Sequence, residues 1–106
     1  MPHRLLNLPE LGLLIYLLRQ VPNADRFLAV LPTIAVEDTN EGSPGNLRFV
    51  GSKSGRQLGS TLAETRFSDE DGVTVLARLY LDQHGNLYEL DCWKVDDSPV
   101  KRIPAF

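Results

Sequence analysis

The sequence predicts an α+β domain in which an N-terminal helix packs on a mainly antiparallel sheet of four to five strands. A chain of 106 residues is the size of one domain with one hydrophobic core. Helical periodicity occurs near the N-terminus, and short strand-like runs separated by turn residues fill the remainder without a βαβ rhythm. We therefore expect a single domain over residues 1–106, with a helix at about residues 8–20 and strands from about residue 33 to 95.

The N-terminal segment carries both a helix start signal and one apolar stripe. Asn7 and Glu10 have the spacing of a capping box. Apolar residues then recur at i, i+3, i+4 and i+7, namely Leu11, Leu14, Ile15 and Leu18. Further apolar residues widen this stripe, so the helix should be largely buried. Pro22 ends it, and residues 25–31 can form a short second helical turn before Pro32.

Five later segments have strand-like composition: Thr33–Glu37, Leu47–Val50, Leu58–Phe67, Val73–Leu81 and Leu87–Val95. The last three are separated by Asp69–Gly72 and Asp82–Gly85, which both read D-x-x-G. In such a turn the aspartate caps backbone amides, and the glycine takes the left-handed position that closes a hairpin. The sequence therefore predicts a C-terminal three-stranded meander, and it leaves the remaining strand order open.

Side-chain chemistry selects a register for the last hairpin. Pairing Leu81 with Leu87 would set Asp91 opposite Ala77 and put a charge among apolar groups. Pairing Leu81 with Tyr88 instead separates the two kinds of side chain, which a buried face requires. One face is then apolar, with Leu79 opposite Leu90 and Ala77 opposite Cys92. The other is polar, with Tyr80 opposite Glu89, Arg78 opposite Asp91 and Leu76 opposite Trp93.

The polar face supplies the candidate partner-binding residues, which are Arg78, Tyr80, Glu89, Asp91 and Trp93. Tyrosine and tryptophan are good amphipathic anchors at protein interfaces. The alternative interpretation is that Trp93 packs over Leu76 beneath the C-terminal tail and that the charges form only solvated ion pairs.

Acidic residues concentrate in the second half of the chain. Residues 64–97 hold nine acids and three bases, a local charge of −6, whereas residues 1–63 are nearly balanced. A field of this sign would steer a basic protein partner, although solvated turns are the alternative explanation. Asp96, Asp97 and Ser98 before Pro99 predict a turn, after which Lys101 and Arg102 can fold back toward the acidic region.

Several chemistries lack their sequence signatures. There is no phosphate-binding glycine loop, zinc-protease motif or paired Cys-x-x-Cys, and His3, His84 and the single Cys92 lack ligand spacing. We therefore predict no catalytic residues, no metal and no cofactor, and an enzyme is the less favoured class. The net charge of −3 and an apolar run of eight residues favour neither a nucleic-acid nor a membrane partner. We expect a cytoplasmic protein, with its oligomeric state open.

The segments "RFSDEDGVTV" and "LYLDQHGNLYELDCWKVDDSPVKRIP" resemble a family of small bacterial domains of unknown function. The family pattern is Leu-x-Glu-Leu-Asp-x-Trp-Lys-x-Asp-x-Ser-Pro, here beginning at Leu87, and the resemblance spans about residues 45–104. Asp97 stands where the pattern has an aromatic residue. No activity is established for that family, so the resemblance implies a domain type rather than a reaction.

Two function classes follow from these observations. The first is a non-catalytic domain that binds a basic protein through its acidic sheet face, for example an immunity-type protein that neutralises a basic toxin. The second is a small enzyme or ligand-binding domain that uses the Arg78, Glu89 and Asp91 cluster or the Gly42–Gly45 loop.

Overall fold

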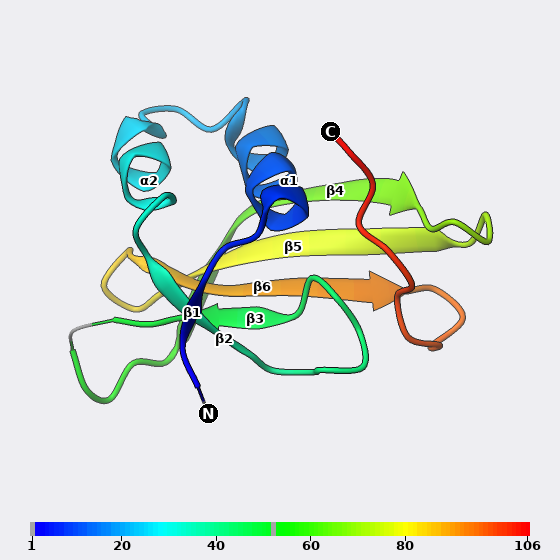
Figure 1. Cartoon of the computed structure of the whole chain (residues 1–106). Coiled ribbons are helices and arrows are strands. Elements are labelled where there is room, and N and C mark those ends of the chain that lie inside the picture. The colour runs from blue at the N-terminus through cyan, green and yellow to red at the C-terminus, as the bar shows by residue number, and fades with distance from the viewer. Residues whose placement is uncertain (1, 52) are drawn as a thin grey trace.

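The structure, a computed structural model, describes residues 2–51 and 53–106 as one six-stranded antiparallel sheet with two helices (Figure 1). The helices are α1 (Leu8–Leu18) and α2 (Asp25–Val30). The sheet order is β1-β2-β3-β6-β5-β4, with strands β1 (Arg4–Leu5), β2 (Ala35–Asp38), β3 (Leu47–Phe49), β4 (Leu58–Ser68), β5 (Thr74–Asp82) and β6 (Leu87–Lys94).

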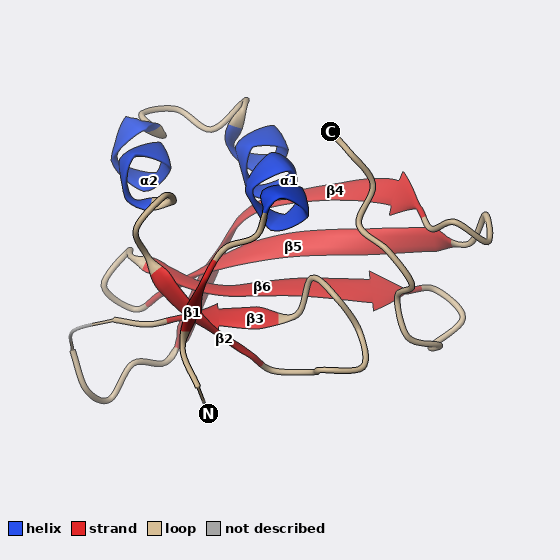
Figure 2. Ribbon diagram, viewed as in Figure 1, coloured by secondary structure: helices blue, strands red, loops and turns tan. Residues whose placement is uncertain are grey.

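Both helices and the C-terminal segment lie over one face of the sheet (Figure 2). We call this the inner face. Its buried residues include Phe49, Val75, Leu79 and Leu90, which form the core together with α1 and with Val100 and Ile103 of the tail. Within the described residues, no helix covers the opposite, outer face. The architecture is therefore two layers with one sheet face left open.

The α+β class and the C-terminal meander are confirmed, but the sheet has six strands rather than four to five. The missing strand is β1, which pairs with β2 through two residues only. A two-residue strand is too short to produce an alternating pattern in the sequence. Its position is fixed by Arg4, which donates to Glu10 of α1 and to Asp38 of β2.

The predicted hairpin register holds for the five pairs from Leu76–Trp93 to Tyr80–Glu89 and is wrong at Leu81. Leu81 lies opposite Leu87 because Tyr88 is an extra residue on β6, a β-bulge. At this bulge, the Tyr88 ring lies near two guanidinium groups, with the Cζ atoms of Arg48 and Arg56 each 5.1 Å from the ring centre.

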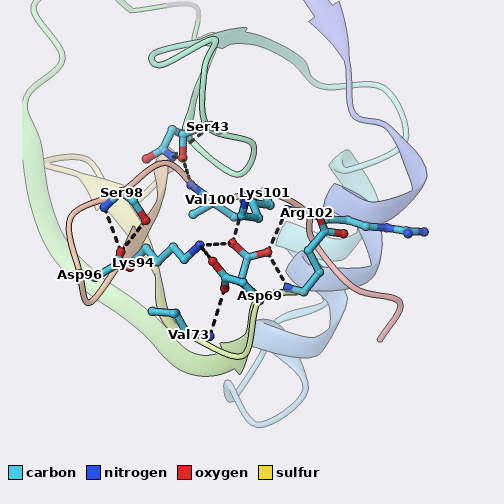
Figure 3. A network of polar contacts seen from close by, with 12 residues as sticks. Ser43, Asp69, Val73, Lys94, Asp96, Ser98, Val100, Lys101 and Arg102 are labelled. Atoms are coloured by element: carbon cyan, nitrogen blue, oxygen red, sulfur yellow. Dashed lines mark hydrogen bonds and ion pairs between the residues drawn. The ribbon is translucent and has the colours of Figure 1, made fainter.

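A buried ammonium group ties the chain together at the far end of β6 (Figure 3). Lys94 is 1% exposed, and its Nζ lies 3.0 Å from Asp69 Oδ2 and also contacts Asp71. The Asp69 carboxylate accepts the backbone N–H groups of Lys101 and Arg102 at 2.7 and 3.1 Å. The tail thus returns to the acidic turn as predicted, but through its backbone amides.

The second D-x-x-G turn contains a similar buried pair. Asp82 Oδ1 caps the N–H groups of His84 and Asn86, and Asp82 Oδ2 accepts Arg56 Nε at 2.9 Å. Arg56 also donates to the carbonyls of Phe49 and Leu87. The turn therefore anchors β3 and the loop before β4, which the sequence pattern does not reveal.

Replacing Lys94 by methionine should lower the free energy of unfolding by about 3 kcal/mol, because Asp69 and Asp71 then lose the cation that compensates their charge. Urea denaturation measures the change. Lys101→Met is the matched control: this exposed residue contributes its backbone amide only, so its effect should stay within about 0.5 kcal/mol. Equal effects of the two substitutions would contradict the assigned role.

The stability of the fold should fall in acid. Burial alone would raise the pKa of Asp69, but the Lys101 amide and the Lys94 ammonium lower it to about 2. The pKa of Asp82 is also lowered to about 2, because Arg56 and two turn amides outweigh its burial.

The unfolded chain, in which these carboxyls titrate near 3.8, takes up protons first as the pH drops. Stability should be fully present above that value and be lost as the pH falls toward 2. Denaturant titrations at successive pH values measure this slope, which Asp82→Asn should reduce. A free energy of unfolding that stays constant down to about pH 2 would refute the assignment.

Candidate functional site

The outer face brings together all five residues that the sequence predicted for it. Arg78 and Tyr80 lie on β5, and Glu89, Asp91 and Trp93 lie on β6. They share a face because β5 and β6 pair in the register that separates apolar from polar side chains. The site is therefore an open surface on regular strands rather than a cleft.

The charged residues of this surface are divided between two separate ion pairs. Arg48 on β3 donates to Glu89 at 2.8 Å, and Arg78 Nε lies 3.2 Å from Glu64 Oε2 on β4. Arg78 is opposite Asp91 in register, yet its ion pair is with Glu64. The three residues of the predicted cluster, Arg78, Glu89 and Asp91, are thus neighbours on β5 and β6, but they do not share one ion-pair network.

Asp91 belongs to neither of these two ion pairs. It is half-buried, and within the described residues its side chain has neither an ion pair nor a hydrogen bond. Burial raises the pKa of Asp91, the adjacent Glu89 charge raises it further, and Arg78 acts in the opposite direction. Ionised Asp91 therefore has no direct counter-ion among the described residues, which makes it a candidate contact for a cation from outside the chain.

Trp93 is 44% exposed and lies two residues after Asp91 on the same face of β6. Its Nε1–H donates to Asp97 Oδ1 at 2.7 Å. Asp97 adopts a left-handed backbone conformation with φ of 64° in the turn that follows β6. The sequence predicts Asp97 only as a turn residue, and nothing in the pattern indicates its contact with the indole.

Most of the acidic residues that suggested an acidic face have structural partners. On the outer face, Glu64 forms an ion pair with Arg78, and Glu89 forms one with Arg48. Asp69 and Asp71 neutralise Lys94, and Asp82 neutralises Arg56. The local charge of −6 is therefore spread over turns, ion pairs and buried networks. On the outer face, Asp91 is an acid that has no direct ion pair within the described residues, although the Arg78 charge partly offsets the rise in its pKa that burial causes.

The Gly42–Gly45 loop is occupied by structural contacts. Buried Ser43 accepts the Val100 amide through its hydroxyl at 2.9 Å. Gly45 has φ of 85°, and a Cβ atom there would lie 2.6 Å from Cys92 Sγ. Cys92 is itself buried, and burial raises the pKa of its thiol to about 12, so it is a poor nucleophile.

A basic cavity that no sequence pattern predicted lies between α2 and the β5–β6 turn. Its volume is about 450 Å³, and its lining includes Arg26, Lys53, Arg56 and Asp82. Arg56 and Asp82 are committed to each other, and Arg26 donates to the Gly85 carbonyl. The segment "GSKSGR" at residues 51–56 was the available sequence signal.

The described part of the chain gives no support for a metal centre or a spanning helix. No three His, Cys, Asp or Glu side chains of residues 2–51 and 53–106 gather so that they could hold a metal ion. No helix in those ranges is long and apolar enough to cross a membrane.

The fold and the open face define a small α+β domain with a preformed surface of aromatic and charged side chains. Residues 3–104 match the family model described as Domain of unknown function (DUF6984), and the chain belongs to that family. No curated protein and no solved structure is detectably similar to the chain.

The two neighbouring carboxylates of β6 should respond oppositely to neutralisation. Asp91→Asn should leave the free energy of unfolding at neutral pH unchanged or increase it, because an acid whose pKa rises on folding opposes folding when ionised. Glu89→Gln should lower it by about 1 kcal/mol, since Arg48 loses its partner. Urea denaturation compares the two variants, and a larger loss for Asp91→Asn would contradict the description of Asp91.

Proposed function

We propose that the chain is a non-catalytic protein-binding domain whose outer face receives a basic segment of a partner protein. The observation that carries this proposal is the half-buried Asp91, which has no ion pair within the described residues, beside the exposed indole of Trp93, which donates to Asp97. An ionised carboxylate without a counter-ion, such as Asp91, lowers the stability of the free domain, and a cation that binds to it offsets this cost.

An arginine side chain of the partner suits this surface best. Its guanidinium can donate two hydrogen bonds to the Asp91 carboxylate while its plane stacks on the Trp93 ring. Tyr80, on the neighbouring strand, adds aromatic contact area. Because the indole is already held by Asp97, little side-chain entropy is lost on binding.

The more specific proposal is an immunity-type protein that neutralises a basic toxin. A sequence isoelectric point near 5.2 favours fast association with a cationic partner. The enzyme alternative has less support, because Arg78 and Glu89 are committed to different ion pairs and the Gly42–Gly45 loop packs on Cys92.

Affinity chromatography of the source organism's lysate on the immobilised domain should capture one basic protein. Trp93→Ala and Asp91→Ala should each weaken its capture at least about tenfold, because they remove the central anchor and its charge. Ile15→Ala is the control, since Ile15 is similarly exposed at 53% but lies on α1, away from the outer face. Capture that persists in both outer-face variants, or is lost equally in the control, would exclude this surface. If the role is immunity, co-expression of the domain should rescue growth from the captured protein.

A further inference from the structure

The longest strand of the sheet has an open edge. β4 spans 11 residues and pairs with β5 on one side only, whereas the opposite edge of the sheet is the two-residue β1. Most β4 residues are exposed or half-buried, and the strand contains neither proline nor lysine, the usual protection of such edges.

The outward-pointing backbone groups of β4 can be assigned. The Asp69 N–H donates to the Val73 carbonyl at 2.9 Å, so these two residues form a hydrogen-bonded pair next to the turn. Hydrogen-bonded and non-hydrogen-bonded pairs alternate along an antiparallel ladder. The N–H and C=O groups of Glu64, Arg66 and Ser68 therefore point away from β5 toward the open edge.

Two of these residues carry opposite charges on the same face. Glu64 and Arg66 are both exposed on the outer face, two residues apart. Glu64 makes an exposed contact with Arg78, and Arg66 forms no ion pair with the described residues. The edge thus presents one acid and one base. When a second copy of the strand runs antiparallel to the first, the acid of each copy can lie opposite the base of the other.

We propose that a second copy of this chain pairs antiparallel with β4 about a two-fold axis at Thr65. In this register Glu64 lies opposite the partner's Arg66, and Arg66 lies opposite the partner's Glu64. In both copies, the backbone N–H and C=O groups of Glu64 and Arg66 point toward the shared edge. Each Glu64–Arg66 pair therefore exchanges two ladder hydrogen bonds. On the inner face, Thr65 meets the partner's Thr65, and Ala63 meets the partner's Phe67.

Competing registers are less favourable. If the register slips by one residue, backbone groups that point toward the edge lie opposite residues whose backbone groups point toward β5. The ladder hydrogen bonds between the two copies then cannot form. Centring the axis on Glu64 or on Arg66 places like charges directly opposite each other, which destabilises a strand pair. Charge therefore selects the register centred on Thr65.

The irregularity between Thr61 and Ala63 limits regular pairing to the C-terminal half of β4. The interface is consequently small, and the dimer should be reversible and dependent on protein concentration. The two copies would share one twelve-stranded sheet and present two outer faces side by side. This inference does not depend on the proposed function: Glu64 of β4 pairs with Arg78, but no β4 residue has a hydrogen bond or ion pair with Asp91 or Trp93 among the described residues.

Sedimentation of purified chain over a dilution series tests the proposal. Glu64→Arg and Arg66→Glu should each raise the dimer dissociation constant at least about tenfold, because each sets like charges opposite each other twice. An equimolar mixture of the two variants should dimerise again, and so should the double variant with both substitutions. Circular dichroism verifies folding of each protein.

Cysteine cross-linking tests the axis directly. Thr65→Cys should form a disulfide-linked dimer under mild oxidation, because residues directly opposite in a non-hydrogen-bonded pair have Cα atoms about 4.5 Å apart. Glu64→Cys is the control and should not cross-link, since Glu64 faces the partner's Arg66. A chain that stays monomeric at every concentration, or single variants that self-associate as well as their mixture, would overturn the proposal. Equal cross-linking at both positions would also overturn it.

Discussion

The buried Lys94 ammonium group and its two aspartates join the end of β6 and the β4–β5 turn to the C-terminal tail, which lies outside the sheet. Lys94 ends β6, Asp69 and Asp71 come from the β4–β5 turn, and the same Asp69 carboxylate binds the amides of the C-terminal tail. Because side chains alternate along a strand, burying Lys94 directs Trp93 to the outer face. The turn that follows then brings Asp97 to the indole. The interaction that stabilises the core therefore also sets the presentation of the candidate site.

Local chemistry made much of the fold predictable. The two D-x-x-G turns gave the meander, and separation of apolar from charged side chains gave the register of five residue pairs. Strand order was not predictable, because the paired residues of β3 and β6 lie 41 and 43 positions apart in the chain, which leaves no local pattern. The bulge at Tyr88 was missed for a related reason: its benefit comes from Arg48 and Arg56, which belong to distant segments.

The residues of the outer face were predicted, but their partners were not. Cross-strand reasoning matched Arg78 with Asp91, whereas the long arginine side chain turns to Glu64 on the other neighbouring strand. The local charge of −6 also includes acids that are buried in the structure. Asp69 and Asp82 are buried counter-ions, so the local charge overstated how acidic the surface is. What remains is a smaller candidate surface around Asp91 and the exposed indole of Trp93.

The packing of Gly45 against Cys92 has a practical consequence. The only sulfhydryl of the chain lies beneath a glycine that leaves no room for an added group, and burial keeps it protonated at neutral pH. Maleimide dyes and nitroxide spin labels should therefore attach to a cysteine engineered at the surface while the native one stays unmodified. Spectroscopic distance measurements on the folded domain need no cysteine-free background.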